Sequence, residues 1–499
     1  MSLKKRGIWG SVVVLGVAVA TFVAAEKHLN ADEDLYKELK PLMESMAIIQ
    51  NNYVDADKVK SKDLVEGAIK GMMGQLDPFS QYMDPQENAD MSSDTKGSFG
   101  GLGIEISQKE KVLVVVSPIE DTPADKAGVK AGDAILKIDG VSTDGLELMD
   151  AVHKMRGEPG TKVTITVWRE GMAAPKDLTI TRAVIKIRSV KSNLMDGQVG
   201  YIRLSTFMGK SAEDFGTALD QLESQGAQSL VIDLRNNPGG LLNAAADIAG
   251  HFVPKGKVIV STASRYKDRD MEFDSDGGDL WNKPTVVLIN GGSASASEIL
   301  AGCLQDYSLA VVVGTKSFGK GSVQTILPLS DGAGLRLTTA KYLTPKGHSL
   351  HGVGVTPDVI SDEEPLSKLV QDLADSDSYA LFWKDYLVEH PAFSFKEEAV
   401  KSAVKVSESS WQVLKPETKE DILLKEFGDW LGQHGHATSM EDLGRDRLQL
   451  LGKLKEELAR KQGGEDAARI AALDEDPQVK AALGVLKVEQ VMAERGKSK

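Results

Sequence analysis

The chain has 499 residues, with 59 Lys and Arg against 73 Asp and Glu, a formal net charge of −14 and one cysteine. This length corresponds to about three domains at roughly 100 to 200 residues each. The hydrophobic content of 41% allows at least one sizeable core. The acidic balance and the lack of a basic stripe argue against nucleic acid as a partner. With Cys303 alone, a disulfide framework and cysteine-based zinc or iron–sulfur sites are excluded.

The first 25 residues have the pattern of an export signal. Lys4, Lys5 and Arg6 precede 18 uncharged residues at 8–25, and an acidic residue follows at once. Small residues at 23–25 suit a cleavage site, but 18 such residues can also just cross a bilayer, so a retained membrane anchor stays open. A buried core helix is the less favoured interpretation. No other segment is long and apolar enough to span, so the rest of the chain is expected outside the cytoplasm.

The remaining chain divides into four parts by its composition and hydrophobic pattern. In an N-terminal region at 26–96, Leu35, Leu39, Leu42, Met46 and Ile49 recur at helical spacing, which predicts one or two amphipathic helices. Short β-rich runs with one helix at 146–156 fill a second part at 97–183. Alternating strands and helices predict an α/β core at 184–362, and a charged helical region follows at 363–499.

The β-rich part begins with SFGGLGIEIS at 98–107, where glycines leave backbone N–H groups free to converge on a carboxylate. With its strand, turn and helix order over 97–183, this part resembles a PDZ domain, and Gly101, Leu102, Gly103 and Ile104 match the carboxylate-binding loop. A peptide would add as a strand along 103–106, with its terminal side chain near Leu148 and Val152. The alternative is a glycine-rich hairpin in an unrelated β domain.

A strand at 285–290 runs into GGSASASEILAG, after which Ile299, Leu300, Cys303, Leu304 and Tyr307 fall at helical spacing. Ser295 or a neighbour, Ser293 or Ser297, therefore lies at a helix N-terminus, where N–H groups and the helix dipole favour developing negative charge. Such a position suits a nucleophile. A serine at this place can equally be an N-cap or a packing residue, so both interpretations stay open.

A serine nucleophile needs a base, and no histidine has an obvious matching place. Lys316 and Lys320 lie in a loop of small residues between apolar runs, where burial can depress an amine pKa. Gly314, Gly319 and Lys320 also match a phosphate-binding loop, but Gly321 stands where Ser or Thr belongs. The β-like residues that follow disfavour a nucleotide-binding function.

Three blocks, VIDLRNNPGGLL at 231–242, GGSASASEILAGCLQDY at 291–307 and GTKSFGKGSVQ at 314–324, closely resemble the C-terminal processing peptidases, or tail-specific proteases. The resemblance covers about residues 35–358, including LDPFSQYMDP before the PDZ-like part. It implies an α/β serine protease core with an inserted β-rich PDZ domain and helical N-terminal and C-terminal regions. Together with the predicted export signal, it indicates an envelope location, in the periplasm or on the outer face of a bacterial inner membrane. No cofactor or metal is expected.

Carried over by position, the resemblance makes Ser295 the nucleophile and Lys320 the general base, with Gln324 orienting the lysine. The N–H groups of Ala296 and Gly240 would form the oxyanion hole, with Gly239 as the alternative second donor. Lys320 would take the proton from Ser295 and return it to the leaving amine as an acyl-enzyme forms. Activity should then fail as the pH drops.

Other residues have plainer interpretations. Arg156 resembles a family arginine that links the PDZ domain to the protease, or it is a solvated residue at a helix end. His348 and His351 lack a third metal ligand. Cys303 is expected to be a core residue. The acidic segment 268–279 misses the calcium-ligand spacing and is expected to be a mobile surface loop.

The helical C-terminal region separates the core from DPQVKAALGVLK, which resembles the closing helix of the family. Its apolar positions fit either packing on the core or assembly between subunits: Ile422, Leu423, Phe427, Leu431, Leu448, Leu451, Leu454 and Leu458. We expect a homo-oligomer acting on proteins or peptides with exposed C-terminal tails, with an adaptor protein as a candidate partner. A non-catalytic PDZ scaffold or chaperone, and an acyl-transfer enzyme acting on a thioester, are the alternatives.

Overall fold

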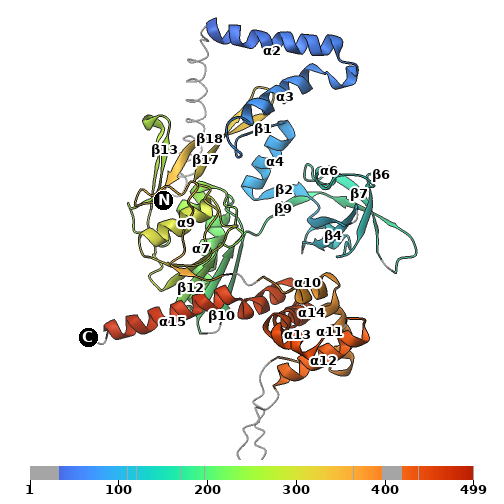
Figure 1. Ribbon diagram of the computed structural model, residues 1–499, viewed down its shortest axis with the longest axis vertical. Helices are drawn as coiled ribbons and strands as arrows, with labels where there is room; N and C mark the ends of the chain where they lie inside the picture. The colour runs from blue at the N-terminus through green and yellow to red at the C-terminus, as the bar shows by residue number, and fades with distance from the viewer. Residues whose placement is uncertain are drawn as a thin grey trace, which may run out of the picture. The chain divides into compact units, whose positions relative to one another are not determined.

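The computed structural model (Figure 1) describes residues 33–497 apart from 110, 120, 170, 196, 363–364, 396–417 and 437. The expected signal or anchor at 1–25 lies outside these ranges. No helix within them has the length and apolar character needed to cross a membrane. The chain forms two compact units. The first comprises Met1–Arg188, Ser261–Glu272 and Gly321–Leu343, and the second comprises Ser189–Val260, Phe273–Lys320 and Thr344–Lys499.

The N-terminal part of the first unit is helical, in agreement with the apolar spacing of its sequence. It contains α2 (Glu33–Asn52), a 3-10 turn η1 (Ala56–Lys58), α3 (Ser61–Met73) and α4 (Pro85–Lys96). Large apolar side chains of α2 stay exposed, with Met43 at 69% and Ile48 at 62%. Helix α3 is anchored instead, because its Met73 is buried in a cluster with residues of the following strand and hairpin.

That hairpin consists of β17 (Ser322–Pro328) and β18 (Gly334–Leu343), which pair antiparallel with a bulge between Val323 and Gln324. The short strand β1 (Gln81–Met83) also pairs with β18, so the segment after α3 is tied to a hairpin more than 200 residues later. Strands β13 (Val258–Ser264) and β14 (Glu272–Asp274) complete this sheet, in the order β1-β18-β13-β14 with β17 on β18.

The PDZ-like part is a β-rich body with its own core, formed by residues such as Leu113, Ile135 and Ile165. Strands β2 (Ser98–Gly101) and β9 (Ala183–Lys186) pair where the chain enters and leaves it. Its sheet has the order β3-β4-β5-β7-β8, with β6 on β5. The elements are β3 (Ile104–Lys109), β4 (Val112–Pro118), α5 (Pro123–Lys126), β5 (Ala134–Ile138), β6 (Val141–Ser142), α6 (Leu148–Met155), β7 (Lys162–Trp168) and β8 (Lys176–Thr181).

The second unit is built on a six-stranded sheet in the order β10-β11-β12-β15-β16-β19. Only β10 runs antiparallel to its neighbour, and the other pairs are parallel. Every residue of β12 and β15 is buried, as expected of parallel strands covered on both faces. The strands are β10 (Val190–Met195), β11 (Val199–Leu204), β12 (Ser229–Asp233), β15 (Thr285–Ile289), β16 (Val311–Gly314) and β19 (Val359–Ile360).

Helices cover this sheet. Helices α7 (Ser211–Ser224), α8 (Leu242–Ala249) and α9 (Ala296–Asp306) contact one another in sequence, and α7 and α9 also contact strands. The final helix, α15 (Pro477–Lys497), packs Val479, Ala482 and Leu486 against Val286 and Leu288 of β15. Because these two β15 residues alternate in sequence, α15 covers a single face of the sheet.

The helical C-terminal region before α15 has a hydrophobic core of its own. It contains α10 (Lys368–Asp375), α11 (Ser378–Glu389), α12 (Lys419–Gln433), α13 (Met440–Arg445) and α14 (Arg447–Glu475). Leu423, Phe427 and Leu458 pack there with Phe382 and Trp383. The two expected roles, packing on the α/β core or assembly between subunits, are therefore wrong for these three residues, because neighbouring helices of the same region cover them.

Candidate active site

Ser295 occupies the turn that joins β15 to α9. Its backbone has φ 56° and ψ −112°, a strained conformation for a residue with a side chain. The hydroxyls of the two neighbouring serines are committed elsewhere, because Ser293 donates to Leu234 O at 2.8 Å and Ser297 to Asn237 O at 2.9 Å. The hydroxyls of Ser293 and Ser297 thus anchor the turn. Ser295 is the remaining nucleophile candidate at the helix N-terminus.

The NPGG loop after β12 runs directly against this turn. A side chain on Gly239 would place its Cβ 2.8 Å from the Cβ of Ser295 and 2.9 Å from Ala296 N. Gly239 N donates to the side chain of Asn237 at 2.9 Å, which removes it as the alternative oxyanion donor. Within the described ranges, Gly240 N and Ala296 N donate to no other residue. Both predicted donors therefore remain available beside the nucleophile turn.

The buried carboxylate of Glu298 ties the nucleophile turn to the lysine loop. It accepts hydrogen bonds from Ser295 N at 2.8 Å, Gly319 N at 2.7 Å and Lys320 N at 2.9 Å, and a fourth from the hydroxyl of Ser317. Charge-assisted bonds of this kind are the strong ones in a protein interior. Sequence reasoning missed Glu298, although Ser-x-x-Glu before an apolar run is the signature of a capping box.

The lysine loop is held at several further points. Phe318 N donates to Ser293 O at 3.0 Å, and Gly352 N donates to Gly319 O at 2.9 Å. Lys320 is half-buried whereas Lys316 is exposed, so of the two candidate lysines Lys320 has the more desolvated position. Strand β17 follows the loop, not the helix that a phosphate-binding loop requires.

Gln324 lies on β17 in the first unit. Its side-chain Nε2 donates to Thr338 Oγ1 at 2.8 Å and to Ser322 Oγ at 3.2 Å. Its action on Lys320 stays a prediction.

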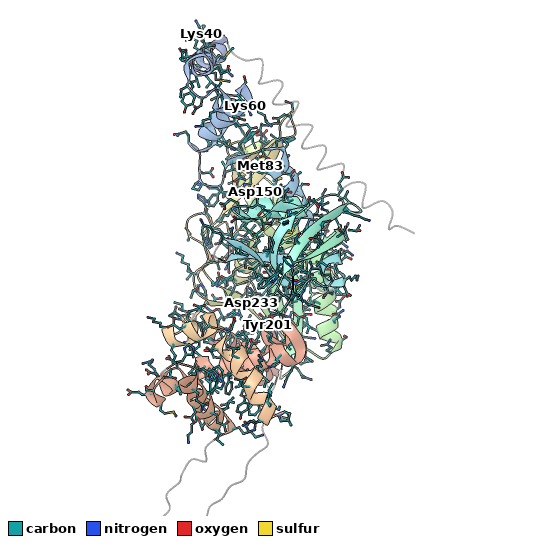
Figure 2. The ribbon with its side chains drawn as sticks, turned by 90° about the vertical axis from the view of Figure 1, so that its right-hand side faces the viewer. Lys40, Lys60, Met83, Asp150, Tyr201 and Asp233 are labelled. Carbon is teal, nitrogen blue, oxygen red and sulfur yellow. The ribbon has the colours of Figure 1, made fainter. Side chains whose placement is uncertain are left out.

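Asp233, at the end of β12, anchors a charged cluster under the NPGG loop (labelled with Tyr201 in Figure 2). Tyr201 donates its hydroxyl to it at 2.7 Å, and Arg235 and Arg203 pair with it at 2.7 and 3.1 Å. Burial raises the pKa of Asp233, but the two arginines outweigh this effect and hold it below its usual value. Arg235 also pairs with Asp476 at the start of α15, so the C-terminal helix is tied to the loop.

The edge of the PDZ-like sheet is open for a peptide strand, because β3 pairs only with β4 among the described residues. Gly103 has φ +79° and a Cβ there would lie 2.3 Å from Thr122, so the loop requires glycine. Ile104 and Leu148 are partly buried beside this core. Leu102 is 3% exposed and its side chain packs in the core, so its predicted part in binding a carboxylate falls to its backbone and stays a prediction. Gly101 of β2 pairs with Ala183 of β9, and Val152 is half-buried on α6.

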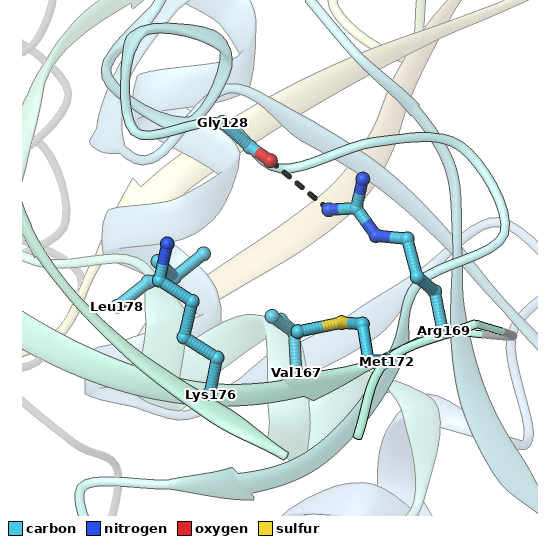
Figure 3. Close-up of a pocket in the computed structure, with 6 residues that line it drawn as sticks. All are labelled: Gly128, Val167, Arg169, Met172, Lys176 and Leu178. Atoms are coloured by element: carbon cyan, nitrogen blue, oxygen red, sulfur yellow. Dashed lines mark hydrogen bonds between the residues drawn. The ribbon is translucent and has the colours of Figure 1, made fainter. Parts of the chain in front are cut away.

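A small cavity of about 270 Å³ lies elsewhere in this part of the chain, lined by residues such as Val167, Met172 and Lys176 (Figure 3). Its arginine, Arg169, donates to Gly128 O at 3.1 Å and pairs with the buried carboxylate of Asp133. The cation is therefore already neutralised. None of the predicted peptide-binding residues lines this cavity.

The remaining candidates have structural surroundings. The Arg156 guanidinium lies 4.4 Å from the ring centroid of Phe99, within the first unit. Burial raises the pKa of the Cys303 thiol to about 12, in keeping with a core residue. No group of three metal-ligating side chains occurs in the described part of the chain, which includes His348 and His351. The acidic segment at 268–279 contains a 3-10 turn, η2 (Lys267–Arg269), and β14, so it is not wholly a loop.

Comparison with known proteins accounts for most of the chain. Residues 198–361 match Peptidase family S41, residues 100–180 match the PDZ domain, and residues 16–87 match the Activating protease CtpB N-terminal domain. The carboxy-terminal-processing protease of Bartonella bacilliformis is 46% identical over 361 residues, covering 71% of this chain and 80% of its own. The chain belongs to the carboxy-terminal processing proteases of peptidase family S41.

CtpB of Bacillus subtilis, a carboxy-terminal processing protease, is 38% identical over 71% of this chain and 74% of its own. Among solved structures, the photosystem II D1 C-terminal processing protease is 33% identical over 65% of this chain and 93% of its own, with a TM-score of 0.40. The family matches and the two bacterial relatives confirm the expected family, fold class and enzyme class: this S41 protein is a serine-type peptidase with a PDZ domain.

Proposed function

We propose that this S41 protease captures C-terminal or unfolded segments of proteins on its PDZ domain and cleaves them through an acyl-enzyme on Ser295. Lys320 takes the hydroxyl proton and delivers it to the leaving amine, Gln324 orients Lys320, and the N–H groups of Gly240 and Ala296 bind the oxyanion. The observation that carries this proposal is the Glu298 carboxylate, which binds the backbone of the nucleophile and of the base at once.

The test is cleavage of an unfolded protein that ends in small apolar residues. The wild type should cut it, and Ser295→Ala and Lys320→Ala should be silent at equal folding, judged by circular dichroism. If all three proteins cut, the site assignment is wrong. If all three are silent with the substrate still bound, the PDZ scaffold or chaperone function is the better account. Turnover of a thioester but not of the tailed substrate would favour acyl transfer.

The PDZ step has its own support in the open edge of β3 and the glycine-dependent loop before it. Deleting residues 97–183 should abolish stimulation of cleavage by a tail peptide. Arg156 is the proposed link between peptide binding and the protease, and Arg156→Ala should weaken the stimulation while the tail peptide still binds. Unchanged stimulation in both proteins would reject gating by the PDZ domain.

Export to the cell envelope is supported by the basic and apolar residues of the first 25 positions.

Self-association through the terminal helices is supported by the exposed apolar side chains of α2 and by Leu448 of α14, which is 65% exposed. Light scattering on the chain without residues 1–25 should give an oligomeric mass, and a monomeric mass across working concentrations would reject this part of the proposal. Pull-down with a tail peptide would reveal an adaptor as a third component.

A further inference from the structure

The LDPFS turn at 76–80 holds a carboxylate in a fixed position beside β18. Asp77 accepts hydrogen bonds from Phe79 N at 2.8 Å, from Ser80 N at 2.9 Å and from Ser80 Oγ at 2.8 Å. Partial burial raises the pKa of Asp77, but hydrogen bonds from Phe79, Ser80 and Thr338 outweigh it and hold the pKa below its usual value. The carboxylate therefore stays an acceptor at neutral pH.

This anion sets the direction of a chain of hydroxyl groups. Ser80 has a single hydroxyl proton, and it is taken by Asp77, so Ser80 Oγ can only accept from its other neighbours. It accepts Thr338 N at 3.1 Å and lies 3.5 Å from Thr338 Oγ1. The Thr338 side chain also hydrogen-bonds the Asp77 carboxylate, which can only accept, so Asp77 takes the Thr338 hydroxyl proton and Thr338 Oγ1 is left as an acceptor for the next group.

That next group is the side-chain amide of Gln324. Because Thr338 Oγ1 must accept, it binds the NH2 end of the amide, at 2.8 Å, and Ser322 Oγ receives the same nitrogen at 3.2 Å. The amide oxygen Oε1 points the other way. It is buried and has no hydrogen-bond partner among the described residues. A buried acceptor in this state favours the binding of a donor.

We propose that Asp77, Ser80 and Thr338 are positioning residues for the reaction, because they fix the orientation of the Gln324 amide, the group proposed to orient the base. The inference rests on the proposed role of Lys320. It assigns a role to the LDPFS turn, which lies outside the three blocks of the protease core. Ser80 of this turn is 258 residues from Thr338 on β18.

A purely structural role would predict a different result, and the same hairpin offers a control. Thr325 and Thr339 also pair their hydroxyls across β17 and β18, at 2.7 Å, but this pair is exposed and is not among the hydrogen-bond partners of the Gln324 side chain, which are Ser322 and Thr338. Thr338→Val and Thr339→Val each replace one hydroxyl by a methyl group on the same strand. Only the first removes the acceptor that fixes the amide.

The experiment measures kcat and KM for a fluorogenic peptide with an apolar C-terminal tail, using the full chain without residues 1–25. Thr338→Val should lower kcat about tenfold and leave KM within about twofold, because the residue does not bind substrate. Thr338→Ser restores the hydroxyl and should recover kcat to within about twofold of the wild type. Thr339→Val should stay within about twofold. Ser80→Ala should resemble Thr338→Val, and it decides the matter if Thr338→Val does not fold.

Equal kcat in Thr338→Val and the wild type, equal losses in Thr338→Val and Thr339→Val, or no recovery in Thr338→Ser would each overturn the inference. Ser295→Ala is run beside these variants. If the wild type cleaves and Ser295→Ala does not, the proposed function stands and only the positioning role is at stake. If the wild type shows no cleavage that depends on Ser295, the proposed function and this inference fail together.

Discussion

Replacing Glu298 by glutamine would remove the charge from the group that binds both the nucleophile turn and the lysine loop. Each carboxylate oxygen accepts two hydrogen bonds, Oε1 from Ser317 Oγ and Gly319 N, and Oε2 from Ser295 N and Lys320 N. A glutamine amide has one oxygen, so its NH2 group faces two donors whichever way it is turned.

The less costly orientation places the NH2 group at the position of Oε1. The Ser317 hydroxyl can turn and accept, but the N–H of Gly319 loses its partner, which costs about 1 to 3 kcal/mol in a buried site. The remaining bonds also lose their charge assistance. We expect a total loss of roughly 2 to 4 kcal/mol, or a fall of roughly 4 to 16 °C in the midpoint of the core's thermal unfolding.

Thermal unfolding followed by circular dichroism would measure this loss, and cleavage of a tailed peptide would measure its effect on activity. Glu223→Gln is the matched control, because Glu223 makes one exposed ion pair with Lys283 on the same unit. The control should stay within about 1 kcal/mol of the wild type. If Glu298→Gln unfolds at the temperature of Glu223→Gln and cleaves at the wild-type rate, the carboxylate does not organise the site.

Two further substitutions, one of them also followed into acid, test the surroundings of the site. Gly240→Ala would put a Cβ 2.0 Å from Phe207 O and displace a proposed oxyanion donor, so kcat should fall about 10²-fold or more at unchanged secondary structure. Asp233→Asn leaves Arg203 and Arg235 without their shared buried anion and should destabilise the second unit by about 3 to 5 kcal/mol in urea unfolding. Because the arginines lower the pKa of Asp233 against the effect of burial, its stabilising contribution is complete above the ordinary carboxyl pKa and lost as pH falls through the folded value. The unfolding midpoints of wild type and Asp233→Asn should therefore converge in acid, and a constant gap would refute the assignment.

Local sequence patterns predicted the parts of the fold that local physics determines. The run at 285–290 gave a buried strand, and the apolar spacing from Ile299 to Leu304 gave a helix directly after it. Ser295, whose backbone is strained, is the last residue of the short turn, 290–295, that joins the two. The choice between Ser293, Ser295 and Ser297 was not local, because it depends on which hydroxyls reach the carbonyls of the loop after β12.

Contacts between distant segments could not be predicted in the same way. The pattern of Glu298 indicates a helix cap, but its bonds to Ser317, Gly319 and Lys320 depend on how a loop about 20 residues later closes over it. The amphipathic helices after residue 363 show the same difficulty. An apolar stripe gives the face that is buried and not what covers it, so a separate core was not distinguished from packing on the protease.

The helices of that separate core form an insertion between β19 and α15. The segment between β19 and α15 starts and ends at one place, because Gln478 Nε2 donates to Ser361 O at 2.7 Å across 117 residues. Beyond this junction α15 packs on the sheet, and Asp476 pairs with Arg235 beside the NPGG loop. An insertion whose two ends meet costs the surrounding fold little chain entropy and no packing. The helices α10 to α14 can thus lie between the last strand and the closing helix while that helix keeps its contacts with the loop that carries Gly240.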